Sequence, residues 1–319
     1  MRLLVVGAGA VGSSVGGFMA KAGHEVTLAG LDAHVETIRE QGLRITGIWG
    51  DHHVANLRAQ TDLSGLKAGD FDLILVSVKS YDTAAAAESF RHLLDAHTLV
   101  CSYQNGLGNA ERIAAVAGWE RTVGARVIYG VRRPAPGHIE ITVIANPTAL
   151  GVYSPEAPAD RVRAIAEAMD AAGLPTVFTD RIATLLWGKV AYNSALNPLS
   201  ALLGVPYGRL PETGHALAIM RDIVHELYAV AGAKGIALEP DSPEAYMDVL
   251  VDRLIPPTAA HYASMHEDFL FHRRTEIDAL NGAISAYGRE HGIPTPANDM
   301  LTPSRPRKKT GRPGMGRGA

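Results

Sequence analysis

One lysine and two asparagines recur every four residues in a stretch of the chain that is otherwise mostly apolar. They are Lys189, Asn193 and Asn197, within the segment 185–199. On an α-helix, this spacing places one ammonium and two carboxamides on one slowly drifting face. Buried groups of this kind need partners, and a bound ligand is a common partner. The residues also allow a plainer arrangement, in which Lys189 extends to solvent and the asparagines cap neighbouring helices.

A glycine-rich turn near the N-terminus predicts a second site. Residues 7–12 read Gly-Ala-Gly-Ala-Val-Gly, directly after the apolar run 2–6 and at the start of a small-residue amphipathic stretch. In this strand-turn-helix context, the first glycine permits the tight turn, the second lets a pyrophosphate approach the backbone, and the third lets helix pack on strand. The phosphates then face the helix N-terminus. We therefore expect a dinucleotide site at Gly7, Ala8, Gly9, Ala10, Val11 and Gly12.

The end of the next predicted strand bears on the choice between NAD and NADP. The chain reads Ala29-Gly30-Leu31-Asp32 there, and Asp32 lies twenty residues beyond Gly12. An acid at this place favours the ribose diol of NAD, whereas an arginine favours the 2′-phosphate of NADP. Asp32 could equally be the N-cap of a helix that starts near Ala33. The residues alone leave both interpretations open.

Alternating strand and helix patterns must position the glycine turn. Strand candidates are residues 2–6, 26–29, 43–46, 73–78, 99–102, 122–128 and 139–143, separated by helical patterns near 10–22, 33–40, 83–94 and 109–117. Such alternation is typical of a parallel sheet with helices on both faces. The sequence therefore predicts an N-terminal Rossmann-type α/β domain over residues 1–179.

Helical periodicity replaces this alternation from about Asp180. Apolar positions at helical spacing continue through the lysine segment, residues 212–234, residues 244–254 and one long run from about 258 to 290. The pattern predicts an all-helical C-terminal domain over residues 180–300. A cleft between two such domains is the expected place for a substrate. Residues 301–319 are basic and rich in Pro and Gly, and we expect a disordered tail.

Composition narrows the class of protein. The formal net charge is −3, so the chain as a whole has no electrostatic reason to bind nucleic acid or an anionic membrane. It lacks a run of roughly twenty apolar residues that would span a membrane. The only cysteine is Cys101, which fits a reducing compartment. We expect a cytoplasmic protein, and no metal site, because the histidines lack the spacing of a metal pair.

Taken in order, these motifs resemble the ketopantoate reductases, the NADPH-dependent 2-dehydropantoate 2-reductases of pantothenate synthesis. The resemblance rests on the glycine turn, Gln104-Asn105-Gly106, the lysine segment with its two asparagines, and Thr275-Glu276-Ile277-Asp278 followed by Asn281-Gly282. It extends from Met1 to about Met300. The family implies reduction of a small 2-keto acid, with NADP as the expected cofactor.

The resemblance assigns roles to individual residues. It makes Lys189 the catalytic lysine, with Asn193 and Asn197 lining the substrate pocket. Glu276 falls at an acidic substrate-binding position on the long C-terminal helical run, and Ser264 falls at a serine that contacts the substrate carboxylate. With these roles, Lys189 polarises the carbonyl and supplies a proton to the developing alkoxide.

Two further residues are implied on the cofactor side, and two departures stand out. Lys79 matches a family lysine that lies close to the cofactor, and Asn105 matches a residue near the nicotinamide and the substrate.

Family members usually have arginine after the second strand, whereas this chain has Leu31 followed by Asp32, which makes NAD plausible as well. The family's closing helix, expected after residues 292–296, is predicted to be replaced by the basic tail.

Three functions remain open from the sequence. The first is reduction of ketopantoate to pantoate, the second is reduction of another branched or polar 2-keto acid, and the third is a non-catalytic dinucleotide sensor that binds a protein partner. Pocket shape separates the first two. Lys189 with its two asparagines argues against the sensor, which needs no proton donor. The apolar C-terminal helices could form a homodimer interface or could pack within the chain.

Overall fold

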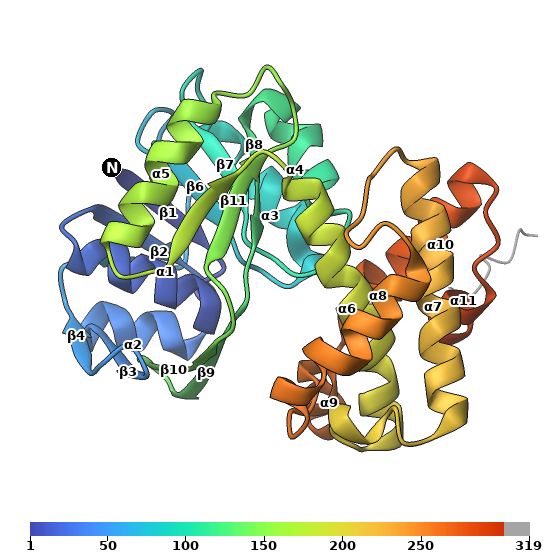
Figure 1. Ribbon diagram of the computed structural model, residues 1–319. Helices are drawn as coiled ribbons and strands as arrows, with labels where there is room; N and C mark the ends of the chain where they lie inside the picture. The colour runs from blue at the N-terminus through green and yellow to red at the C-terminus, as the bar shows by residue number, and fades with distance from the viewer. Residues whose placement is uncertain (303–319) are drawn as a thin grey trace, which may run out of the picture.

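A mixed sheet forms the centre of the N-terminal half of the molecule (Figure 1). The computed structural model describes residues 1–302. The strands of this sheet are β1 (Arg2–Val6), β2 (Glu25–Ala29), β5 (Arg58–Gln60), β6 (Leu73–Val76), β7 (Leu99–Ser102), β8 (Thr122–Arg126), β11 (Thr148–Val152) and β12 (Thr176–Thr179). Their order is β12-β11-β8-β7-β6-β1-β2-β5, and neighbours run parallel except for β11 against β8. This confirms the predicted Rossmann-type sheet and adds β5, β11 and β12, which the sequence pattern missed.

Helices cover both faces of the sheet because alternate residues of each strand point to opposite sides. The helices are α1 (Ala10–Lys21), α2 (Ala33–Gln41), α3 (Thr83–Ser89), α4 (Asn109–Ala117) and α5 (Ala159–Ala171). Leu3 and Val5 of β1 pack in one core with Val15 of α1. Leu4 of β1 packs in a separate core with Ile113 of α4. Two apolar layers therefore hold the strands that carry the glycine turn and the later loops.

A second, smaller sheet corrects the expectation of one parallel sheet. Its strands are β3 (Leu43–Gly47), β4 (His52–Val54), β9 (Tyr129–Ala135) and β10 (His138–Ile144), in the order β4-β3-β10-β9. The segments 43–46 and 139–143 are strands as predicted, but they belong to this sheet. The turn at Pro136-Gly137 is too short for a parallel crossover, so β9 and β10 pair antiparallel.

Helices alone make up the C-terminal half within the described residues. They are α6 (Ile182–Leu203), α7 (Gly214–Ala233), α8 (Pro243–Val249), α9 (Ser264–Leu270), α10 (Asn281–His291) and α11 (Pro296–Leu301). Figure 1 shows α6 leading from the sheet into this helical half. Leu196 of α6, Val224 of α7 and Ile284 of α10 are fully buried in a common core. The predicted change from alternating elements to helices after the sheet is confirmed.

Pro198 lies inside α6 without ending the helix. A proline there cannot donate to the carbonyl of Ser194, four residues earlier. The side chain of Asn281 supplies the missing donor, with its Nδ2 3.2 Å from the Ser194 carbonyl oxygen. Asn281 also donates to Asn298 Oδ1 at 3.0 Å. The helix that carries Lys189 is thus continuous because a neighbouring helix satisfies its freed carbonyl.

The single helical run expected from about 258 to 290 is wrong, because the chain breaks between α9 and α10. His272 has a φ of 51°, a left-handed conformation that ends a helix. Just beyond it, the Arg273 backbone N–H donates to the Asp268 carbonyl at 2.7 Å and its Nε to the Asp268 carboxylate at 3.1 Å. Glu276 therefore precedes a short 3-10 turn, Ile277–Ala279, instead of lying on a helix. Apolar spacing alone could not reveal this break.

A short helix, α11, occupies residues 296–301, where the family's closing helix was predicted to be replaced by a tail, so the prediction is corrected for those residues. Buried Asn298 of α11 donates to Glu226 of α7 at 2.7 Å, and the backbone N–H of Ala297 donates to the same carboxylate at 2.7 Å. Glu226 thus holds the first turn of α11 against α7. The disordered tail was predicted over residues 301–319: Leu301 is instead the last residue of α11, and residues 303–319 lie outside the described part of the chain.

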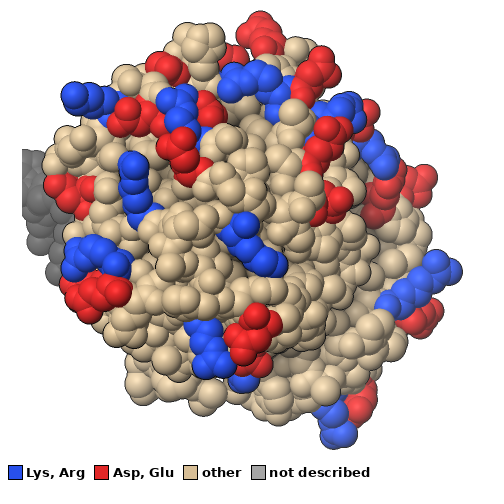
Figure 2. All heavy atoms as spheres, turned by 90° about the vertical axis from the view of Figure 1, so that its left-hand side faces the viewer, with Lys and Arg blue, Asp and Glu red and all other residues tan. Residues whose placement is uncertain are grey.

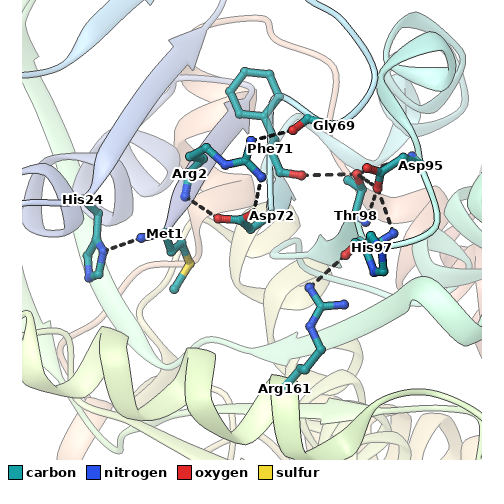
Figure 3. Close-up of polar contacts among 10 residues, drawn as sticks. All are labelled: Met1, Arg2, His24, Gly69, Phe71, Asp72, Asp95, His97, Thr98 and Arg161. Atoms are coloured by element: carbon teal, nitrogen blue, oxygen red, sulfur yellow. Dashed lines mark hydrogen bonds and ion pairs between the residues drawn. The ribbon is translucent and has the colours of Figure 1, made fainter.

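Polar contacts tie the amino ends of the central strands together (Figure 3). The Arg2 guanidinium donates to the Gly69 carbonyl at 2.6 Å and to Asp72 Oδ1 at 2.5 Å, in front of β6. Thr98, in front of β7, donates through Oγ1 to the Phe71 carbonyl at 3.2 Å. These contacts occupy polar groups at the amino edge, and in sheets of this kind ligands bind at the carboxyl edge of the strands, where the glycine turn lies.

Charges of both signs are interspersed on the outer face of the sheet half. Figure 2 shows basic and acidic side chains there, most of them next to one another, with uncharged surface between the groups. This pattern is typical of a solvated surface, whereas a polyanion footprint is a stripe or patch of basic residues. Among the described residues, no helix is both long and apolar enough to cross a membrane. Within the same range, no three His, Cys, Asp or Glu side chains are grouped as a metal site would require.

Candidate active site

The glycine turn between β1 and α1 has the backbone shape that a dinucleotide needs. Gly7 has a φ of 99°, and a Cβ there would lie 2.5 Å from the Val78 backbone nitrogen. A Cβ on Gly12 would lie 2.4 Å from the Gly7 carbonyl oxygen. A Cβ on Gly9 would have no described atom within 4 Å, so the surface of Gly9 is open. No described side chain caps the start of α1, which leaves its first N–H groups available to phosphate oxygens.

Asp32 is the N-cap of α2 and also forms an ion pair. Its Oδ1 accepts from the His34 backbone N–H at 3.2 Å, so the capping role considered from the sequence is present. Its Oδ2 accepts from Nη1 of Arg133 on β9. Both oxygens of the Asp32 carboxylate therefore already accept hydrogen bonds, unlike those of a carboxylate that is free to bind the hydroxyls of a ribose.

A small polar hollow brings the predicted substrate residues together between the two halves of the molecule. Its lining comprises Asn105, Asn193, Asn197, Ser264, Met265, Asp268, Glu276 and Leu280. These side chains come from the loop after β7, from α6, from α9 and from the turn before α10. Five of them were predicted from the sequence, although they lie up to 171 positions apart in the chain, from Asn105 to Glu276. A second hollow, lined by residues such as Gln104, Leu107 and Trp187, contains none of the predicted residues.

Lys189 lies beside this hollow and contacts Asn105, one of its lining residues. Its Nζ donates to Asn105 Oδ1 at 2.5 Å and to the Val127 carbonyl oxygen at 2.5 Å, just beyond β8. Burial, reinforced by the nearby charge of Arg126, lowers the pKa of the Lys189 ammonium to about 8, while Glu276 acts in the opposite direction. The ammonium is therefore a stronger acid than an ordinary lysine, and two acceptors fix its position.

Glu276 and Lys79 join the helical half to the sheet half. Lys79 Nζ lies 3.1 Å from Glu276 Oε2 and 3.8 Å from Asp268 Oδ2. The Ser80 backbone N–H donates to Glu276 Oε1 at 2.9 Å. Burial by itself would lower the pKa of Lys79, but the carboxylates of Glu276 and Asp268 outweigh it and raise that pKa. Glu276 is thus held in the hollow by the loop after β6.

Two residues that the sequence pattern did not single out also belong to this region. Asp268 is buried and lies four positions after Ser264 on α9, so helical spacing could have indicated it. Buried Tyr207 donates from its hydroxyl to Asn197 Oδ1 at 2.6 Å. That contact fixes the Asn197 carboxamide and turns its NH₂ group away from Tyr207. Spacing could not have revealed Tyr207, since only the fold brings it to α6.

Gly106 is expected to be intolerant of substitution because it supports the loop that holds Asn105. It has a φ of 86°, and a Cβ there would lie 2.5 Å from the Ala279 carbonyl oxygen. That oxygen accepts from the Leu107 backbone N–H at 2.8 Å. Gly106→Ala should therefore cost about 2 kcal/mol or more of stability, from backbone strain and the clash, and should also lower turnover. Thermal unfolding and steady-state rates measure both effects.

Gly65→Ala is the matched control for that substitution. Gly65 is exposed and no described atom lies within 4 Å of a Cβ built on it. The thermal unfolding midpoint and the turnover of the Gly65→Ala protein should equal those of the unchanged protein. A Gly106→Ala protein that matches the control in both measurements would contradict the proposed role of the loop.

Fold and site together define a class of enzyme. A glycine turn of the dinucleotide-binding type on a mostly parallel sheet, joined to a helical domain whose buried lysine contacts a lining residue of a polar hollow, is the architecture of a nicotinamide-dependent oxidoreductase. The family model described as ketopantoate reductase PanE/ApbA matches residues 3–155, and the model for the C-terminal part of that family matches residues 181–303. The chain belongs to the ketopantoate reductase family.

Individual relatives agree with this assignment. The chain is 36% identical over 302 residues to the 2-dehydropantoate 2-reductase of Aquifex aeolicus, and the match covers 95% of each protein. The crystal structure of a PanE/ApbA family ketopantoate reductase from Ralstonia eutropha JMP134 is 34% identical, with a TM-score of 0.83, and the match covers 94% of this chain and 96% of that one. A ternary structure of D-mandelate dehydrogenase with NADH and anilino(oxo)acetate is 27% identical, with a TM-score of 0.82 over the same shares of the chains.

Proposed function

We propose that this protein reduces 2-dehydropantoate (ketopantoate) to pantoate with NADPH, in pantothenate biosynthesis in the cytoplasm. The observation that carries the proposal is the ammonium of Lys189, held by Asn105, which lines one hollow together with Ser264 and Glu276. Relatives named for this reaction support the choice of substrate. We assign dinucleotide binding to residues 1–179 and substrate binding mainly to residues 180–300.

Lys189 is the proposed catalytic residue. When bound, the nicotinamide supplies the hydride for the carbonyl carbon. The Lys189 ammonium polarises the carbonyl and then gives its proton to the developing alkoxide oxygen. Asn105, which lines the hollow, accepts from the ammonium and so holds it beside the hollow. A lysine with a lowered pKa suits this role, because transfer of its proton costs less than from an ordinary lysine.

The remaining residues of the hollow match the other groups of the substrate. Ser264 is proposed to donate to the carboxylate, and Glu276 to accept from the terminal hydroxyl. Asn193 and the NH₂ group of Asn197 orient the substrate without competing for the proton. Lys79 balances the charge of Glu276 and lies toward the cofactor side.

A different 2-keto acid is the second candidate substrate. The similar D-mandelate dehydrogenase structure was solved with anilino(oxo)acetate, so this fold also accepts an aryl-bearing oxo acid. The polar lining favours ketopantoate here, because only a substrate with a hydroxyl uses Glu276. Oxidation of NADPH and of NADH at 340 nm, with ketopantoate, 2-ketoisovalerate or benzoylformate, tests the proposal. Turnover of ketopantoate well above the other acids supports it, and cofactor binding without turnover of any acid would favour the sensor instead.

The reduction should slow as the pH rises through about 8. The pKa of Lys189 is lowered from the ordinary lysine range to about 8, so the proton-donating ammonium predominates below that pH and is lost above it. kcat/KM for ketopantoate should therefore fall about tenfold per pH unit above 8, while oxidation of pantoate should rise over the same range. A kcat/KM for reduction that stays flat from pH 7 to 9.5 would exclude Lys189 as the acid.

A further inference from the structure

Arg133 lies beside the place where the ribose of a bound dinucleotide is expected. The backbone N–H groups of Gly7 and Ala8 donate to the Ala29 carbonyl at 2.9 and 3.0 Å, so the end of β2 adjoins the glycine turn. Asp32 follows three residues later, and Arg133 donates to its carboxylate. The two side chains are 40% and 49% exposed, so a ligand can reach both.

The hairpin of β9 and β10 delivers Arg133 to this position through a built contact. Its turn residue Gly137 donates from its backbone N–H to buried His34 Nδ1 at 2.9 Å, and the other ring nitrogen of His34 lies 3.0 Å from Ser13 Oγ of α1. The Gly137 carbonyl accepts from the Arg44 backbone N–H at 2.8 Å. The hairpin is thus fixed to α1, α2 and β3. Arg133 is therefore held near Asp32 by the hairpin as well as by their ion pair.

Neither of the two side chains that follow Gly30 at the end of β2 can bind a phosphate by itself. Leu31, which stands where the resemblance calls for an arginine, is 90% exposed and has no polar atom in its side chain. Asp32 would repel a phosphomonoester unless a cation lay between them. A guanidinium has five N–H donors in a planar fork, so it can bond a carboxylate and a phosphate at the same time. Within residues 1–302, Asp32 is the side chain to which Arg133 donates.

We infer that Arg133 recognises the ribose 2′-phosphate of NADPH, and that Asp32 is a positioning residue that holds the guanidinium in place. The inference rests on the proposed function, since it concerns the cofactor of that reaction. It assigns the cation of the 2′-phosphate site to the hairpin of the small sheet instead of the loop after β2. Asp32, read from its position alone as a sign of NAD, then contributes to a preference for NADP.

Equilibrium binding of NADP⁺ and NAD⁺ by titration calorimetry tests this inference without any catalysis. Arg133→Met should weaken NADP⁺ binding about 10- to 100-fold, the effect of losing charge-assisted hydrogen bonds, and should change NAD⁺ binding less than about threefold. Asp32→Asn should weaken NADP⁺ binding more mildly and leave NAD⁺ binding unchanged. Arg132→Met is the matched control, because Arg132 is the preceding residue of β9 and pairs with Glu140 at 2.7 Å. It should change neither affinity.

The outcomes separate this inference from the proposed function. Equal NADP⁺ affinity in the unchanged protein and in Arg133→Met would overturn the inference and leave the reductase intact. A loss of NAD⁺ binding in Asp32→Asn, with NADP⁺ binding unaffected by Arg133→Met, would overturn it in favour of Asp32 reading the ribose diol. Failure of the unchanged protein to bind either dinucleotide would instead refute the proposed function.

Discussion

Lys189→Ala is expected to lower kcat for ketopantoate reduction by about 10²- to 10⁴-fold, the usual contribution of a positioned general acid. The substitution removes both the proton donor and the charge that polarises the carbonyl. It also leaves the oxygens of Asn105 and Val127 without the donor that they share in the structure. Steady-state assays at saturating cofactor and substrate measure the loss, and NADP⁺ affinity should stay within a few-fold of its original value because Lys189 lies on α6, away from the glycine turn.

Two companion variants make the Lys189 result interpretable. Lys67→Ala removes an exposed lysine in the loop before β6 and should leave kcat unchanged. Lys189→Arg keeps the positive charge but is a much weaker acid, so its kcat should stay low and its rate should no longer fall near pH 8. A Lys189→Ala protein that is folded and turns over ketopantoate at a near-normal rate would refute the assignment.

Glu276→Ala is expected to raise KM for ketopantoate by about 10- to 100-fold, the range for a lost hydrogen bond to a charged group. The carboxylate is proposed to accept from the substrate hydroxyl, and the Ser80 N–H and Lys79 hold it in place. Because 2-ketoisovalerate lacks that hydroxyl, its KM should change much less. The comparison of the two substrates in the same variant is the decisive measurement.

A purely structural role for Glu276 predicts a different result. If the carboxylate only paired with Lys79 to join the two halves, its loss would impair both substrates equally and lower thermal stability. Glu244→Ala provides the control, since Glu244 is a 69% exposed acid of the same helical half. It should alter neither KM. Equal losses for ketopantoate and 2-ketoisovalerate in Glu276→Ala would contradict the assignment of the hydroxyl contact.

Local sequence patterns were sufficient to predict the features that depend on residues close together in the chain. The turn at Gly7 to Gly12 could be predicted because a strand, a tight turn and a helix are consecutive, and only glycine tolerates the contacts at Gly7 and Gly12. The face formed by Lys189, Asn193 and Asn197 followed from helical spacing alone. The chain's helical half could be recognised for the same reason, since its apolar residues repeat with the period of a helix.

The break between α9 and α10, and the contact of Glu276 with Lys79, depended on segments that are distant in the chain. The sequence pattern continued through residues 258–290, whereas the structure ends α9 at Leu270 and uses Asp268 to hold the following turn. This break is what allows Glu276 to meet Lys79, 197 positions earlier. A short-range pattern cannot contain such information, because the free energy that decides it comes from partners supplied by another part of the fold.

Asp32 illustrates the same division at the cofactor site. From the sequence it was an acid at the end of a strand, with two equally good interpretations. The structure adds Arg133, 101 positions away, and makes the acid one half of an ion pair. By itself the sequence determined that the chain has a dinucleotide turn, a lysine face and a helical second half, because each depends on residues a few positions apart. Only the tertiary structure decided which charges face one another, because electrostatic interactions depend on distance in space and not on separation along the chain.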